Sequence, residues 1–282
     1  MANLFSGLEA FGLGKMSDLD VYASEDKSNK SAENSAEASE KEKIVEADFL
    51  FEKSYTCPVC EGEFKVKTIK TGKIKLISAD TDLRPKYQNV DSLKYDVVVC
   101  PHCGYSALNR FFNYMTSTQA KLIREQISAS FKGINEDCDE YTYDDAIARH
   151  KLALVNTIVK KSKISERAYT CLKTAWLLRG KAESLPEDTK DYNEQIKQLQ
   201  KEELEFIANA YEGFIDAFSK EMFPMCGMDE YTVTYLVADL ARRIGKHDEA
   251  SRWISKVLIA RNANERIKAK ARELKELLKN KE

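Results

Sequence analysis

The sequence predicts an α+β protein that is mainly α-helical, with a small β module followed by irregular helical hairpins. Two Cys-Pro-x-Cys motifs, at residues 57–60 and 100–103, are separated by 39 residues. Residues 64–77 alternate apolar and charged side chains, which is the period of a half-buried strand. After Phe112, apolar residues recur at helical spacing almost to the C-terminus.

The first segment, residues 1–22, carries a short apolar stripe on one face of a predicted helix. Its members are Leu4, Phe5, Leu8 and Phe11. We interpret the stripe as a docking segment for a groove; the competing interpretation is a frayed terminus. Residues 23–47 are rich in Ser, Ala, Glu and Lys, and cannot bury enough apolar surface to offset their ordering entropy. They are therefore predicted to form a disordered tether.

Residues 48–113 are predicted to be a metal-binding module. Two cysteines three residues apart, joined by a tight turn, can bind one metal ion, and two such turns complete a tetrahedral site. The expected ligands of one structural Zn²⁺ per chain are Cys57, Cys60, Cys100 and Cys103. Two disulfides, four unrelated buried thiols, or iron bound by the same four thiolates are the alternatives. Zinc is favoured because a cytosolic chain keeps its thiols reduced.

Short strands are expected around these motifs. Residues 64–70 and 73–77 both alternate and are separated by Thr71-Gly72, so they are predicted to pair as a hairpin. Residues 95–99 are rich in β-branched side chains and run directly into Cys100. Cysteine turns carried by short antiparallel strands are the layout of a zinc ribbon. Such a module has little core of its own, so the metal contributes much of its folding free energy.

The predicted hairpin is basic. It carries five lysines and no acidic residue: Lys65, Lys67, Lys70, Lys73 and Lys75. This pattern suits a nucleic-acid or acidic-partner surface. A solvated strand face is the favoured interpretation, because aromatic side chains for base stacking are sparse there. Residues 1–48 hold five Lys and eleven Asp or Glu, a net charge of −6. Because the whole chain carries −2, residues 49–282 carry +4. A net charge this small does not indicate a nucleic-acid binder.

Residues 114–282 are predicted to form a helical domain. Thr116-x-x-Gln119 is a capping box at the start of its first helix. Residues 143–258 resemble tetratricopeptide repeats, helical hairpins that stack into a solenoid, through recurring alanine and aromatic spacing. The resemblance is irregular, because residues 181–204 interrupt the second unit. Residues 262–280 are amphipathic and are predicted to form a terminal capping helix.

The sequence gives little support for catalysis. It contains neither a phosphate-binding glycine-rich loop followed by Lys and Ser or Thr, nor a His-Glu-x-x-His motif. His102, between two expected ligands, is predicted to be an exposed turn residue. The remaining cysteines are expected to be buried or incidental thiols: Cys138, Cys171 and Cys226. No apolar run approaches the ~20 residues of a membrane span, and no secretory signal is visible, so a cytoplasmic location is expected.

The first cysteine motif, the stretch Tyr95–Tyr105 and the helical tail together resemble a bacterial family, the domain of unknown function numbered 2225. The resemblance spans about residues 49–270. It implies a bacterial, cytoplasmic protein with no assigned reaction. It also implies that the four cysteines bind metal, and it carries over no catalytic residue.

Together these features favour a non-enzymatic zinc-binding interaction scaffold, in which a helical groove binds a peptide or protein partner. A zinc ribbon that binds nucleic acid and an uncharacterised enzyme are the alternatives. The apolar stripe of residues 1–22 is a candidate ligand for such a groove, on a partner or on this chain.

Overall fold

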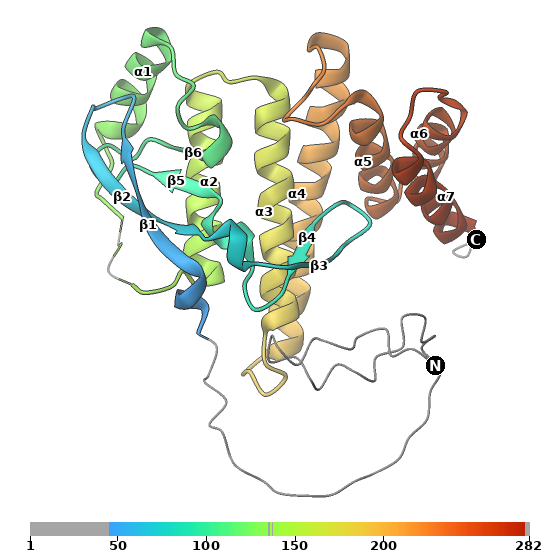
Figure 1. Cartoon of the computed structure of the whole chain (residues 1–282), viewed down its shortest axis with the longest axis horizontal. Helices are drawn as coiled ribbons and strands as arrows, with labels where there is room; N and C mark the ends of the chain where they lie inside the picture. The colour runs from blue at the N-terminus through green and yellow to red at the C-terminus, as the bar shows by residue number, and fades with distance from the viewer. Residues whose placement is uncertain (1–44, 135, 137, 280–282) are drawn as a thin grey trace, which may run out of the picture. The chain divides into compact units, whose positions relative to one another are not determined.

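Three two-stranded antiparallel sheets precede the helices in the computed structural model, which describes residues 45–134, 136 and 138–279 (Figure 1). The pairs are β1 (Leu50–Thr56) with β2 (Glu63–Ile69), β3 (Leu76–Ala79) with β4 (Pro85–Tyr87), and β5 (Val97–Val99) with β6 (Ser106–Leu108). The predicted fold class, a small β module followed by a larger helical part, is confirmed.

One predicted strand pairing is wrong. β2 pairs along its whole length with β1, so that Tyr55 lies opposite Phe64. Residues 71–73 form a 3₁₀ turn, and β3 then pairs with β4 instead of with β2. The alternation in residues 64–70 identified β2 correctly but could not identify its partner. β1 buries only two of its seven residues, and therefore lacks the alternation by which a strand is recognised.

Each cysteine motif closes one antiparallel hairpin. Residues 57–60 follow β1 and precede β2, whereas residues 100–103 lie between β5 and β6. The second hairpin is buried on both faces. Val98 packs in a core with Tyr105 on one face, and Val97 and Val99 pack against Ala153 of the first long helix on the other. This hairpin therefore attaches the metal-binding module to the helices.

The helices follow in chain order: α1 (Ser117–Ile123), α2 (Tyr143–Val159), α3 (Ile164–Ser184), α4 (Tyr192–Lys220), α5 (Glu230–Arg243), α6 (His247–Ile259) and α7 (Glu265–Lys279). α1 begins at the predicted capping box of Thr116 and Gln119. From α2 onward each helix packs on its neighbours in the chain, with Trp176 and Phe214 buried among them (Figure 1). The expected neighbour packing is confirmed, while the resemblance to tetratricopeptide repeats stays a prediction.

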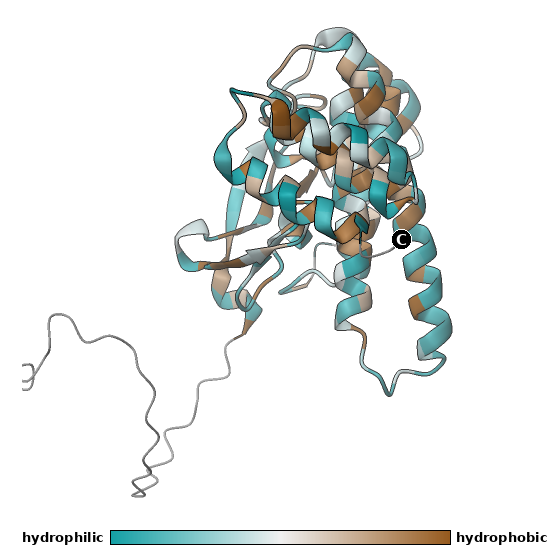
Figure 2. Ribbon diagram, turned by 90° about the vertical axis from the view of Figure 1, so that its right-hand side faces the viewer, coloured by the Kyte–Doolittle hydropathy of each residue, from teal (hydrophilic) through white to brown (hydrophobic). Residues whose placement is uncertain are grey.

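The interruption predicted for residues 181–204 is shorter in the structure. α3 continues to Ser184 and α4 begins at Tyr192, so most of that stretch is helical. Its glutamate, glutamine and lysine residues are strong helix formers. They are hydrophilic and mostly exposed, with Leu199 among the few buried side chains of these turns (Figure 2). The shortage of apolar residues in residues 181–204 therefore reflects solvent-exposed helical turns rather than a long loop.

The C-terminal prediction is confirmed by α7, whose buried face consists of Ala271, Leu274 and Leu278. Hydrophilic residues line the outward faces of the C-terminal helices in Figure 2, as expected for a last packed layer. Among the residues that the structure describes, no helix is both long enough and apolar enough to cross a membrane.

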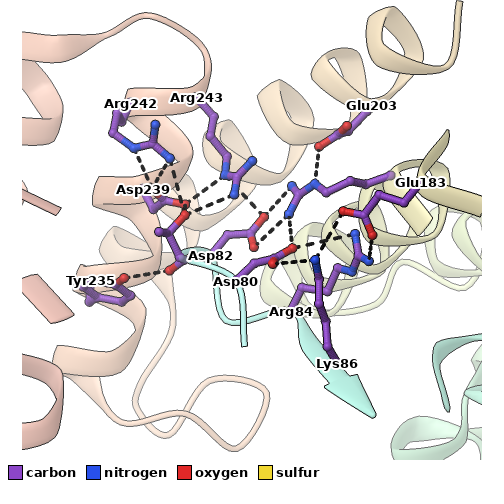
Figure 3. Close-up of polar contacts among 12 residues, drawn as sticks. Asp80, Asp82, Arg84, Lys86, Glu183, Glu203, Tyr235, Asp239, Arg242 and Arg243 are labelled. Atoms are coloured by element: carbon purple, nitrogen blue, oxygen red, sulfur yellow. Dashed lines mark hydrogen bonds and ion pairs between the residues drawn. The ribbon is translucent and has the colours of Figure 1, made fainter. Parts of the chain in front are cut away.

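A network of buried charges binds the loop between β3 and β4 to α3 and α5 (Figure 3). Asp82 is fully buried and accepts two hydrogen bonds from the guanidinium of Arg179, at 3.1 and 2.6 Å. It also lies 3.4 Å from Arg243. Thr81 donates to the buried carboxylate of Asp239 (2.8 Å). The sequence near Asp82 does not identify the residues of α3 and α5 that this loop contacts.

We expect Asp82→Ala to lower the free energy of unfolding by about 1.5–3 kcal/mol, because it removes a fully buried carboxylate that accepts two hydrogen bonds from Arg179. Arg179 keeps Glu203 and Arg243 keeps Asp239 as counter-charges. Asp144→Ala is the matched control: Asp144 is exposed, pairs with Lys181, and should cost about 0–1 kcal/mol. Denaturant titration measures both. Equal losses would contradict this view of the network.

The same carboxylate sets a pH dependence. Burial raises the pKa of Asp82, but the hydrogen bonds from Arg179 and the charges of Arg243 and Arg179 outweigh it and lower the pKa below its usual value. A lowered folded-state pKa gives stability that is present above the unfolded value of about 3.9 and is lost as the pH falls through the folded value. Wild type should therefore lose stability more steeply than Asp82→Ala below about pH 4.

Candidate metal centre

The four predicted ligands converge on one point. The Sγ atoms of Cys57 and Cys103 are 3.6 Å apart, as are those of Cys60 and Cys100. All four sulfurs lie within 4.8 Å of one another. A tetrahedral Zn²⁺ with Zn–S bonds of about 2.3 Å separates its sulfurs by about 3.8 Å, which these distances match. A disulfide requires about 2.05 Å, and all seven cysteines are free, so the two-disulfide alternative is wrong.

The two cysteine turns share one main-chain geometry. In each, the N–H of the first cysteine donates to the carbonyl five residues later, at 3.0 and 2.8 Å. The N–H four residues later donates back to the carbonyl of that cysteine, at 2.9 and 3.0 Å. This fold-back requires a positive φ after the second cysteine, and Glu61 (62°) and Gly104 (72°) adopt it. Gly104 adopts this conformation without the steric cost that a side chain brings.

The thiols cannot all ionise without a cation among them. The neighbouring thiol of Cys100 and burial raise the pKa of Cys57 to about 12. Its neighbours raise the pKa of Cys103 as well, whereas hydrogen bonds from Cys103 and Cys57 lower that of Cys100. Within the first turn, the N–H of Val59 points at Cys57 Sγ (3.4 Å) and favours the thiolate. A metal ion stabilises all four thiolates, so the donor set fits a borderline or soft divalent metal.

Most of the sulfur cluster is buried against aromatic side chains. Cys57, Cys100 and Cys103 are buried and Cys60 is exposed. Aromatic rings pack beneath the cluster: Tyr55, Phe64, Tyr105 and Phe112.

The turn that extends α1 contacts both cysteine motifs: Arg124 Nε donates to the carbonyl of Val59 and Ser128 Oγ to that of Cys103, each at 2.9 Å. From α2, the buried Asn156 donates to the carbonyl of Gly104 (3.2 Å). Sequence reasoning missed these three residues. The buried face of α2 also carries His150 and Thr157, so the sequence did not single out Asn156.

The remaining histidine and cysteines of interest lie as expected. His102 is exposed, and its Nε2 lies 3.3 Å from the carbonyl oxygen of Glu63 rather than in the sulfur cluster. Cys138 is half-buried. Burial raises the pKa of Cys171 to about 11 and that of Cys226 to about 12, so both are protonated at neutral pH.

The predicted basic hairpin is not formed, and three of its lysines have other partners. Lys65 pairs with Glu52 across β1 and β2 (3.2 Å). Lys67 and Lys70 each donate to a main-chain carbonyl at 3.2 Å. The structure therefore does not contain the single basic hairpin on which the nucleic-acid alternative was based.

The candidate partner-binding residues lie outside the described part of the chain: Leu4, Phe5, Leu8 and Phe11.

Comparison with known proteins identifies the family. The model of the family described as "Uncharacterized protein conserved in bacteria (DUF2225)" matches residues 50–278, and the chain belongs to this family. An uncharacterized protein of Borreliella burgdorferi is 22% identical over 157 residues, which are 50% of this chain and 56% of that protein. The chain thus spans little more than half the length of this relative. No solved structure matches the chain.

We expect Gly104→Ala to destabilise the module by about 1–3 kcal/mol, because a side chain is strained at its positive φ. The added Cβ would also lie 2.6 Å from the ring of Phe131. Glu61→Ala, at the equivalent place in the other turn, should change stability by no more than about 0.5 kcal/mol. Denaturant titration of the metal-loaded protein compares the stability of the two variants. Equal losses would contradict the view that the positive φ and close packing at Gly104 require glycine.

Proposed function

We propose that this chain is a non-enzymatic cytoplasmic scaffold that contains one structural Zn²⁺ and binds a peptide or protein partner through its helices. The sulfur cluster carries the proposal. Four protein ligands complete a tetrahedral coordination, and such closed sites serve structure, whereas catalytic sites keep a position open. When bound, zinc would contribute folding free energy to hairpins whose strands are three to seven residues long.

A cavity beside the metal module supports the binding role. It has a volume of about 580 Å³, within the range of ligand sites, and we call it the Met222 cavity. Its apolar lining includes Phe111, Tyr114, Met115, Met222 and Pro224. Met222 is 89% exposed and Tyr114 75%, so two large apolar side chains stand unburied at its mouth. Exposed apolar groups gathered at a hollow suit an apolar segment of a partner.

The metal assignment is tested by elemental analysis of purified protein. We expect one zinc per chain in the wild type and well under one in Cys103→Ser, because three thiolates do not complete the site. Cys171→Ser is the matched control: this thiol is also buried but lies outside the cluster, so zinc content should not change. Iron in place of zinc, or metal-free protein with reduced thiols, would overturn the assignment.

The binding role is tested by retention of partners from a cell extract. Met222→Glu places a charge at the cavity mouth and should abolish retention. Ile259→Glu changes an equally exposed apolar residue on α6 and should leave it intact. A partner lost only in Met222→Glu, and unaffected by nuclease, supports the scaffold. Nuclease-sensitive retention would instead support the nucleic-acid alternative.

A further inference from the structure

We propose that the cysteine cluster is also a site of oxidative modification, at which hydrogen peroxide oxidises Cys60 and joins it to Cys100 in a disulfide. Two of the four expected ligands are consumed in this reaction, so the metal is released. The inference goes beyond the scaffold role, but it rests on the structural zinc proposed above. Exposure selects the cysteine that reacts first, and the distances between the sulfurs select its partner.

Cys60 is the accessible sulfur of the cluster. It is exposed, whereas the other three cysteines are at most 5% exposed and belong to the aromatic core beneath the cluster: Cys57, Cys100 and Cys103. A Cβ added at Gly62 would lie 3.5 Å from Cys60 Sγ and 2.8 Å from Cδ2 of the exposed His102 ring. Cys60 is therefore bordered by a glycine and an exposed imidazole, and a small neutral oxidant can reach it.

Cys60 also has the ionisation state that oxidation requires. The thiolate is both the metal ligand and the nucleophile, so Cys60 is deprotonated when the metal is bound. The thiols outside the cluster differ. Burial raises the pKa of Cys171 to about 11 and that of Cys226 to about 12, so both are protonated as well as shielded. Oxidation follows thiolate character and exposure, and Cys60 combines the two.

The sulfur distances select Cys100 as the partner. Cys100 Sγ lies 3.6 Å from Cys60 Sγ, and a disulfide of about 2.05 Å requires the two to approach by about 1.5 Å. Cys57, the other cysteine of the same turn, has its 3.6 Å contact with Cys103 instead. The geometry therefore predicts a disulfide between the two hairpins rather than within one Cys-Pro-x-Cys turn.

The reaction needs one molecule of peroxide for each disulfide. The Cys60 thiolate attacks one peroxide oxygen, so that an S–O bond forms, the O–O bond breaks and hydroxide leaves. Cys60 is thereby oxidised by two electrons to a sulfenic acid. The Cys100 thiolate then attacks the sulfenic sulfur, so that the S–S bond forms, the S–O bond breaks and a second hydroxide leaves.

The two remaining thiolates, Cys57 and Cys103, do not complete a tetrahedral site, so the metal leaves. The new disulfide closes residues 60–100 into the same loop that the metal closes. The two hairpins therefore stay joined in the oxidised protein, whereas a disulfide within either turn would leave them unconnected. A dithiol reductant reverses the modification by thiol–disulfide exchange and restores the four ligands.

The test oxidises the full chain with one equivalent of hydrogen peroxide in the absence of air. A chromogenic chelator measures released zinc, and mass spectrometry with fragmentation locates the disulfide after the remaining thiols are alkylated. Trypsin leaves both cysteines of each turn on one peptide, so a disulfide between the hairpins joins two peptides. We expect one zinc to be released for each Cys60–Cys100 disulfide. A disulfide within either turn, or zinc retained after oxidation, would overturn the proposal.

A pair of variants tests whether Cys60 is where oxidation begins. Cys60→His keeps a zinc ligand but removes the exposed thiolate, and peroxide should release its bound zinc at least about tenfold more slowly than that of wild type. Cys138→Ser, the control, removes a half-buried thiol outside the cluster and should react at the wild-type rate. Because the rate is measured per bound zinc, partial loading does not affect the comparison. A wild-type rate in Cys60→His contradicts the proposal.

The zinc assignment and this inference fail separately. Zinc content measured before peroxide is added tests the assignment, and protein that contains no zinc contradicts it. A zinc-loaded chain that peroxide leaves with Cys60 reduced contradicts only the oxidative modification.

Discussion

The meeting of the two cysteine turns is the contact on which the β module depends. Its sulfurs lie 3.6 Å apart although Cys60 and Cys100 are 40 residues apart in the chain. Isolated two-stranded hairpins are marginally stable in water, and β5 and β6 have three residues each. Once the turns meet, the intervening chain becomes a closed loop. The middle of this loop, at Asp82, forms ion pairs with Arg179 of α3 and Arg243 of α5. Residues 60–100 are therefore held at both ends by the cysteine cluster and at the centre by buried ion pairs.

The charge network has a different role from the sulfur cluster. A buried ion pair contributes little net stability compared with an apolar replacement, because desolvation opposes the attraction between the charges. Removing one partner is costly all the same, since the other is left buried and uncompensated. Asp82 and Asp239 are both completely buried, so this penalty applies to each of them in full. The network thus selects one position for the β3–β4 loop, because any other arrangement separates the buried Asp82 from Arg179 and Arg243.

Features that depend on neighbouring residues were predictable from the sequence, and features that depend on distant ones were not. Cysteine spacing, the capping box at Thr116 and the apolar stripe of α7 are set within a few residues of chain, and all three are confirmed. The pairing of β2 was not predictable, because β1 buries too few residues to be recognised as its partner. Likewise, nothing near Asp82 indicates that its counter-charge comes from Arg179 on another element.

The Met222 cavity depends on both halves of this architecture. Phe111 and Met115 form one wall and pack against the core that carries the sulfurs, whereas Met222 and Pro224 come from the segment between α4 and α5. Arg110, just after β6, donates to the carbonyl of Cys226 and so joins the two walls. Under the proposed function, a ligand that contacts both walls would stabilise their alignment, and a metal in the sulfur cluster would stabilise the wall that carries Phe111 and Met115. The two sites would then be thermodynamically linked, and each binding event would favour the other by the same factor.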